Sequence, residues 1–127
     1  MEVWNALIEG AHASAEPGVL FWDTAKTMTP SDAYEAEGFG STSTNPCGEI
    51  MLRDMQFSNL SEVVVREDDD LDSLLDKVET ATWLGVIQSS FTYFPYLRNE
   101  WKKNCDVEAL IGVSLTGQMD NHAILSS

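Results

Sequence analysis

The sequence predicts an α/β fold in which helices alternate with the strands of a largely parallel sheet. Stretches with apolar residues at helical spacing alternate with short apolar runs along the 127 residues, and this alternation is typical of βαβ units. Hydrophobic residues make up 43% of the chain, an ordinary fraction for a globular protein. The length therefore fits one modest domain or a segment of a larger one.

The first elements are expected to be a helix, a strand and a long loop. The helix carries four apolar residues at helical spacing, namely Trp4, Leu7, Ile8 and Ala11. The tripeptide Glu16-Pro17-Gly18 is expected to end it, and the apolar run at residues 19–22 then predicts a short buried strand. Residues 24–44 are rich in Thr, Ser, Gly and acids, which predicts a helical turn and a loop long enough to have a function.

The second half of the chain predicts two strands and two helices. Residues 59–65 and 110–115 have the composition of strands. Pro95 is expected to open a helix that carries Leu97 and Trp101. The longer helix between the first strand and Pro95 has a buried face of apolar residues at helical spacing: Leu71, Leu74, Leu75, Val78 and Ala81.

Two groups of residues in this half have a functional and a structural interpretation. Gly112 and Gly117 lack the Gly-Lys-Ser/Thr ending of a phosphate loop, so a turn at a strand end is favoured over a nucleotide cradle. One interpretation of an aromatic cluster is stacking on bases or relay of a radical, but packing in a core or interface is favoured. Its members are Phe91, Tyr93, Phe94, Tyr96 and Trp101.

Charge limits the set of partners. The net charge is −14, from 21 acidic and 7 basic residues, which argues against direct binding of nucleic acid. The acidic run at residues 67–70, with Asp72, could be imagined as a divalent metal site, but a solvated turn whose last acids cap the next helix is favoured. His12 and His122 have no ligand partner at metal-binding spacing, so no metal site is predicted.

Cysteine usage and hydropathy predict a cytoplasmic protein with no membrane partner. No apolar run approaches the roughly 18 residues needed to span a bilayer, and the start of the chain lacks a basic region before an apolar core. Cys47 and Cys105 lie far apart and outside any Cys-x-x-Cys pair, so neither a zinc site nor a disulfide is predicted. Cys105 is interpreted as an incidental surface or half-buried thiol.

The segment Asn45-Pro46-Cys47-Gly48-Glu49 is the most informative feature of the chain. Proline restricts the backbone before the thiol and glycine allows a turn after it, so a tight loop is expected to present Cys47. A thiol between a carboxamide and a carboxylate suits redox or radical chemistry on a polar substrate. The alternatives without a catalytic role are a small buried side chain for Cys47, a turn residue for Asn45 and an exposed acid for Glu49.

Four blocks in order carry a resemblance to a known family. They are Glu-Pro-Gly-Val-Leu-Phe-Trp-Asp at 16–23, Ser-Thr-Asn-Pro-Cys-Gly-Glu-Ile at 43–50, Phe-Ser-Asn-Leu-Ser-Glu-Val at 57–63 and Ile-Gly-Val-Ser-Leu-Thr-Gly at 111–117. Together they resemble the large catalytic subunit of ribonucleotide reductases, most closely the monomeric branch of the adenosylcobalamin-dependent class. The resemblance implies that residues 1–127 form a single segment of a ten-stranded α/β barrel, with an inward catalytic finger loop at about residues 40–58.

The same resemblance implies roles for individual residues. Cys47 would become a transient thiyl radical that removes the 3′ hydrogen of the ribose, and Glu49 would be the base at the 3′ hydroxyl. Asn45 would hydrogen-bond the ribose hydroxyls, because a carboxamide both donates and accepts. Ser43 and Thr44 would contact the substrate.

The implied activity is the reduction of ribonucleotides to deoxyribonucleotides for DNA synthesis. Adenosylcobalamin is the implied cofactor, and its binding region would lie outside this chain. The implied partners are therefore the ribonucleotide substrate and the remaining reductase segments or a companion chain.

Ser58 departs from the family pattern, which has a redox cysteine at this position. A hydroxyl cannot form a disulfide or take part in thiol exchange. Either the reductant differs, or the residue has been changed, or the chain is not a competent reductase. Two hypotheses follow: a catalytic segment that works only with missing segments, or a degenerate fragment that acts as an interaction or structural piece.

Overall fold

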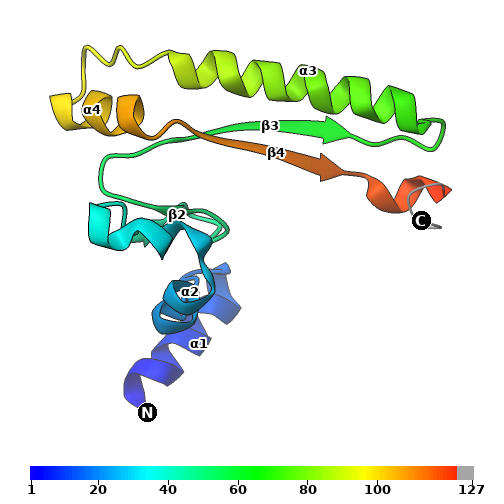
Figure 1. Cartoon of the computed structure of the whole chain (residues 1–127). Coiled ribbons are helices and arrows are strands. Elements are labelled where there is room, and N and C mark those ends of the chain that lie inside the picture. Colours follow the sequence, from blue (N-terminus) through cyan, green and yellow to red (C-terminus); the bar gives the residue numbers. More distant parts are fainter. Residues whose placement is uncertain (123–127) are drawn as a thin grey trace. The chain divides into compact units, whose positions relative to one another are not determined.

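The computed structural model describes residues 1–122 and divides into two compact units, Met1–Arg53 and Asp54–Ser127 (Figure 1). Helices and strands are mixed in the chain, as expected for the α/β class. The described residues form two sheets of two strands each and no closed barrel. A place in a ten-stranded barrel therefore stays a prediction, as does the expectation of a single segment.

The first unit contains two helices, a 3-10 helix and a short hairpin. Helix α1 spans Glu2–Ser14, which confirms the first predicted helix, and α2 spans Trp22–Met28. The 3-10 helix η1 follows at Pro30–Glu37. Strands β1 (Ser43–Thr44) and β2 (Met51–Leu52) pair antiparallel, with Ser43 opposite Leu52 and Thr44 opposite Met51.

The prediction of a buried strand at residues 19–22 is wrong. Val19, Leu20 and Phe21 are in an irregular segment and are 49%, 45% and 70% exposed, and Trp22 already begins α2. A strand needs a neighbour to satisfy its backbone groups. Among the described residues of the first unit, the only paired strands are the two strands of the short hairpin, each two residues long. The apolar run therefore has no neighbouring strand with which to form backbone hydrogen bonds.

The second unit is a βαβ arrangement. Strands β3 (Ser58–Val64) and β4 (Leu110–Thr116) pair in parallel, from Ser58 opposite Leu110 to Val64 opposite Thr116. Helix α3 (Leu71–Ser90) lies along this pair (Figure 1). Both strands, their parallel direction and the long helix are confirmed. A helix is the usual way to connect parallel strands.

The acidic run before α3 caps that helix. The Asp70 carboxylate accepts a hydrogen bond from the Ser73 backbone N–H at 2.8 Å, and this contact lowers the pKa of Asp70. Asp69 pairs with Lys77 at 2.5 Å. The favoured interpretation of the last acids as a helix cap is thus confirmed for Asp70.

The helix expected from Pro95 begins later than predicted. Helix α4 spans Asn99–Val107 and includes Trp101, whereas Leu97 precedes it. The Leu97 N–H donates to the Phe94 carbonyl at 3.1 Å, which closes a turn over Pro95 and Tyr96. Proline is favoured at the second position of such turns as well as at a helix start, and here the turn prevails.

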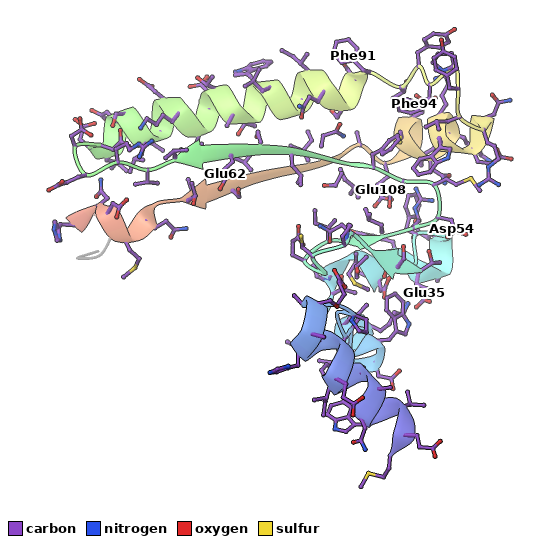
Figure 2. The ribbon with its side chains drawn as sticks, turned by 180° about the vertical axis from the view of Figure 1, so that it is seen from behind. Glu35, Asp54, Glu62, Phe91, Phe94 and Glu108 are labelled. Carbon is purple, nitrogen blue, oxygen red and sulfur yellow. The ribbon has the colours of Figure 1, made fainter. Side chains whose placement is uncertain are left out.

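The aromatic cluster is only partly packed. Phe57 lies 4.6 Å from Trp101 in a stacked arrangement and 5.1 Å from Phe94 in an edge-on one, measured between ring centroids. Figure 2 shows Phe94 beside α4 and Phe91 at the end of α3. The exposed members of the cluster are Phe91, Tyr93 and Tyr96. The packing interpretation is therefore confirmed for Phe94 and Trp101, whereas for these three only packing in an interface stays a prediction.

The core of the second unit is small. The buried apolar residues there are Val63, Val65, Ala81 and Cys105. The interpretation of Cys105 as a surface or half-buried thiol is wrong, since the residue is 8% exposed on the inner side of α4. At Gly117, which follows β4, φ is +74°, so the prediction of a turn at the strand end is confirmed for this residue and is wrong for Gly112, which lies inside β4.

Candidate active site: the Cys47 turn

Cys47 lies in the turn that joins β1 to β2. The Asn45 N–H donates to the Ile50 carbonyl at 3.2 Å, and the Gly48 N–H donates to the Asn45 carbonyl at 3.0 Å. Gly48 has φ +84°, a conformation that residues with a side chain rarely adopt. This backbone leaves the Cys47 thiol exposed, so the prediction of a tight loop that presents it is confirmed.

The Asn45 carboxamide ties the two sides of the turn together. Its Oδ1 accepts a hydrogen bond from the Ile50 N–H at 3.0 Å, and its Nδ2 donates to Oε1 of Glu49 at 2.5 Å. A carboxamide has two N–H donors and two lone pairs on oxygen. Asn45 can therefore hold Glu49 and the backbone while keeping capacity for a ligand.

A cavity of about 420 Å³ opens beside the thiol. Residues of the turn, among them Thr44 and Cys47, form one side, and residues between Ala15 and Leu20 form the other. Two of the four motif blocks therefore meet at Cys47. Small-molecule sites generally have volumes of about 300–1,000 Å³, so this space fits a small polar ligand.

Ser43 and Thr44 occupy different positions. Thr44 is half-buried, lines the cavity and donates a hydrogen bond from Oγ1 to the Asn45 carbonyl at 2.9 Å. Ser43 is exposed on β1. A substrate contact is thus better supported for Thr44, and both contacts stay predictions.

Ser58 belongs to the second unit. It opens β3 opposite Leu110 and is half-buried. Next to it, the Asn59 side chain donates a hydrogen bond to the Leu110 carbonyl at 3.0 Å, which joins the starts of the two strands. Ser58 therefore stands at a sheet position.

A buried carboxylate anchors the chain that enters β1. Asp32 accepts hydrogen bonds from the backbone N–H of Ser41 at 2.7 Å and from its hydroxyl at 2.6 Å, and it pairs with Lys26 at 2.8 Å. These contacts, with Lys26 the largest cause, lower the pKa of Asp32 to about 2. Sequence reasoning missed this cluster because its members are nine residues or more from Ser41 and no local motif joins them.

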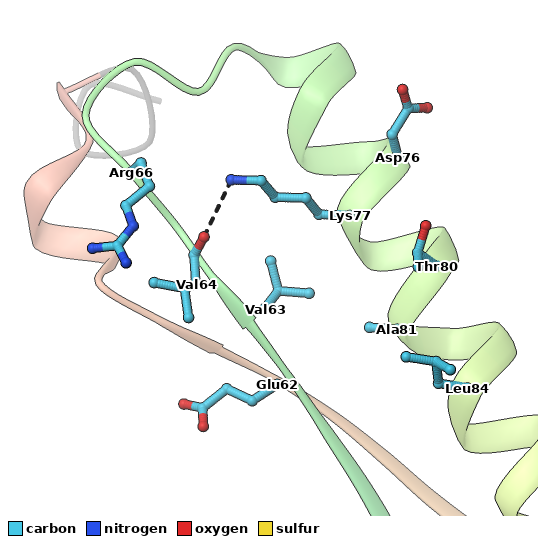
Figure 3. Close-up of a pocket in the computed structure, with 9 residues that line it drawn as sticks. All are labelled: Glu62, Val63, Val64, Arg66, Asp76, Lys77, Thr80, Ala81 and Leu84. Carbon is cyan, nitrogen blue, oxygen red and sulfur yellow. Dashed lines mark hydrogen bonds between the residues drawn. The ribbon is translucent and has the colours of Figure 1, made fainter.

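A second cavity, of about 550 Å³, lies between β3 and α3 in the second unit. Figure 3 shows Glu62 and Arg66 on the strand side and Asp76 and Lys77 on the helix side. The Lys77 ammonium donates to the Val64 carbonyl at 3.3 Å (Figure 3) and also binds Asp69. None of the residues that the sequence predicted as site residues lines this cavity.

Two further features bear on function. Among residues 1–122, no group of three His, Cys, Asp or Glu side chains is arranged to hold a metal ion. In the same part of the chain, no helix combines the length and the apolar character needed to cross a membrane.

Comparison with known proteins supports the motif resemblance. The chain is 35% identical over 88 residues to the vitamin B12-dependent ribonucleoside-diphosphate reductase of Thermoplasma acidophilum, a match that covers 64% of this chain and 11% of the relative. It is 35% identical over 63 residues to the enzyme of the same name from Mycobacterium tuberculosis, covering 49% and 8%. No family model and no solved structure matches.

The chain spans about a tenth of the length of these curated relatives. Over the matched residues it is similar to a segment of a vitamin B12-dependent ribonucleotide reductase, as the motifs predicted.

Proposed function

We propose that this chain supplies the radical-bearing loop of a vitamin B12-dependent ribonucleotide reductase and acts together with the other segments of such an enzyme. The observation that carries the proposal is the Cys47 turn: an exposed thiol faces a cavity, and the Asn45–Glu49 pair stands at the base of the same turn. The similarity to reductases of that name supports the same assignment.

In this proposal Cys47 acts as the hydrogen-atom acceptor. The sulfur radical takes the hydrogen from C3′ of the ribose, so an S–H bond forms, a C–H bond breaks and the unpaired electron moves to C3′. Adenosylcobalamin, held by other segments of such an enzyme, would supply the radical that removes the hydrogen atom from the Cys47 thiol. The exposed thiol and the open cavity fit that role, because an oxidant and a substrate must both reach the sulfur.

In the same proposal Glu49 acts as a base at the sugar hydroxyls, and Asn45 positions Glu49. Glu49 accepts the proton of the 3′ hydroxyl as the radical forms at C3′, which helps the 2′ hydroxyl leave as water after it gains a proton from the dithiol reductant. Asn45 holds the Glu49 carboxylate in place through its Nδ2. A carboxylate fixed before the substrate arrives loses less entropy in the reaction than a mobile one.

The two electrons that complete the reduction must come from outside the described residues. Ser58 cannot supply them, since a hydroxyl does not cycle through disulfide exchange. We assign this step to a dithiol reductant on another segment or protein, which becomes a disulfide as the 2′ position is reduced. Cys47 then returns its hydrogen atom to C3′ and is a sulfur radical again. A cytoplasmic location fits this reduced-thiol chemistry.

A second candidate function is an interaction or structural piece without catalysis. Ser58 favours it, because the family pattern has a cysteine there. Large apolar side chains that remain open to solvent also favour it, for example Trp83 at 59% and Phe91 at 69% exposure. Exposed apolar surface of this kind often marks a contact with another protein.

The decisive test is reconstitution with the companion polypeptides. The chain is captured from its source with its partners, adenosylcobalamin and a dithiol are added, and deoxyribonucleotide formation is measured. Cys47→Ser should abolish product, whereas Cys105→Ala should keep it, because Cys105 is buried in the other unit. Product that persists in the Cys47→Ser variant would exclude the catalytic role and leave the structural one.

A further inference from the structure

The cavity beside Cys47 has one wall that does not belong to the turn, and this wall includes the acid Glu16 as well as the aliphatic Val19 and Leu20. This wall is the irregular segment between Ala15 and Leu20, and Leu20 is its point of closest approach to the glycine that follows the thiol. Leu20 Cδ1 lies 3.9 Å from the position that a Cβ on Gly48 would occupy, which is van der Waals contact. Leu20 therefore lies near the turn that carries Cys47 and lines the same cavity.

The wall is held to the end of α1 and is not a loose loop. Ala15 ends the helix in the left-handed conformation, with φ 62°, and its N–H donates to the Ala11 carbonyl at 2.9 Å. The Ser14 hydroxyl contacts the Glu16 carbonyl at 3.3 Å. Gly10 lets the Glu16 carbonyl come close, because a Cβ there would lie 3.1 Å from that oxygen. The position of the wall thus depends on α1.

We propose that Leu20 is a positioning residue that limits the direction from which a ligand reaches the Cys47 thiol. An aliphatic side chain repels charged and strongly hydrated groups and accepts C–H surfaces. Of the polar residues that line the cavity, Thr44 and Cys47 belong to the turn and Glu16 belongs to the wall. The aliphatic part of the wall, Val19 and Leu20, offers a surface for the C–H face of a sugar ring. Only the naming of that ligand as a ribose rests on the proposed function.

Thiol labelling tests this inference on the chain itself. Cys47 is labelled with a small reagent, iodoacetamide, and with a bulky maleimide, and peptide mass spectrometry separates its labelling from that of Cys105. Leu20→Ala should raise the rate ratio of bulky to small reagent by about threefold or more, the equivalent of roughly 0.7 kcal/mol. Leu20→Phe, which adds volume to the wall, should lower the same ratio.

Ile8→Ala is the matched control. Ile8 is 48% exposed, close to the 45% of Leu20, and it lies on α1 outside the set of residues that line the cavity. Its substitution should leave the labelling ratio unchanged. A third variant, Gly10→Ala, should alter the ratio by moving the wall, because the new methyl group displaces the carbonyl of Glu16, which lines the cavity.

The outcomes separate this inference from the proposed function. If Leu20→Ala and Leu20→Phe both leave the ratio where Ile8→Ala leaves it, Leu20 does not control access and the inference is overturned, whatever the reductase assay shows. If the labelling ratio changes as expected while the Cys47→Ser variant still forms deoxyribonucleotides, Leu20 controls access to the thiol and the catalytic proposal fails. Circular dichroism of each variant verifies that α1 is retained.

Discussion

Asn45 and Glu49 are joined side chain to side chain, with Nδ2 of Asn45 2.5 Å from Oε1 of Glu49. The same carboxamide accepts the Ile50 N–H at 3.0 Å. One residue therefore determines both the shape of the Cys47 turn and the position of its carboxylate. Two substitutions at position 45 can separate these effects.

Asn45→Ala removes both contacts, whereas Asn45→Asp keeps an oxygen for the Ile50 N–H and loses the donor to Glu49. Hydrogen exchange of the Ile50 amide should become about fivefold faster in the alanine variant, as expected for a hydrogen bond worth roughly 1 kcal/mol. The aspartate variant should keep Ile50 protected while placing a like charge beside Glu49. Equal exchange rates in the two variants would show that Oδ1 does not hold the turn.

The Asp32 cluster should make the first unit sensitive to acid. Lys26 and the Ser41 hydroxyl and N–H lower the pKa of Asp32 from its usual 3.8 to about 2. A carboxyl whose pKa is lowered by folding adds stability that is fully present above its unfolded pKa and is lost as pH falls toward the folded one. The protection factor of the Ser41 amide should therefore decrease between about pH 4 and pH 2.

Asp32→Asn should remove this pH dependence, because the amide does not titrate. Asp23→Asn is the control, since Asp23 is an exposed residue of α2. Hydrogen exchange measured by NMR from pH 5 to pH 2, corrected for the intrinsic rate, provides the comparison. A decrease of the same size in wild type and Asp32→Asn would mean that another group is responsible.

Gly85 determines how closely α3 approaches the sheet. A Cβ at this position would lie 2.7 Å from Cγ2 of Ile111 on β4, and the branched Cβ of isoleucine leaves that methyl little freedom. Overpacking of this kind costs about 1–3 kcal/mol, more than the roughly 1 kcal/mol that alanine gains over glycine in a helix. Gly85→Ala should therefore lower the free energy of unfolding in urea.

Gly112→Ala is the informative comparison. Its Cβ would also lie 2.7 Å from a neighbour, but that neighbour is Cδ2 at the far end of Leu60, a side chain that is 52% exposed. Leu60 can turn away, so the cost should be small. The double variant Gly85→Ala with Ile111→Ala should be less destabilised than the sum of its single variants; additive effects would refute the contact.

Asn121 fastens the end of the described chain to the turn before α3. It is fully buried, and its Nδ2 donates to the carbonyls of Arg66 and Asp69, both at 2.8 Å. Asn121→Ala leaves two partly buried carbonyls without these donors and should cost about 1–3 kcal/mol. Asn121→Asp should cost more at pH 7 than at pH 3, because a charged carboxylate would face two carbonyl oxygens. Urea denaturation at both pH values checks the order, and an aspartate variant as stable as wild type at pH 7 would contradict it.

Much of the second unit could be predicted because its apolar residues recur with the periods of helices and strands. Apolar residues at helical spacing marked α3, and the two short apolar runs marked β3 and β4. The apolar run at residues 19–22 carried the same kind of signal and formed no strand. An apolar run indicates that a segment tends to be buried, but it does not show which other segment it packs against. Among the described residues of the first unit, no strand is available to pair with residues 19–22.

The site was predicted in part. The sequence placed Asn45, Cys47 and Glu49 in one turn, because proline and glycine around a thiol restrict the backbone locally. It did not reveal Leu20 as a wall of the cavity or the Asp32 contact with Ser41, since neither contact is expressed in a local pattern.

By itself the sequence determined the tight turn that exposes the Cys47 thiol, the periodic elements of the second unit and the motifs shared with reductases. Only the tertiary structure decided that Cys105 is buried, that Leu20 lines the cavity beside Cys47, and that Pro95 lies in a turn before α4. The physical reason is range. Backbone preference acts over a few neighbouring residues, whereas burial and contact depend on which distant segments the chain brings together.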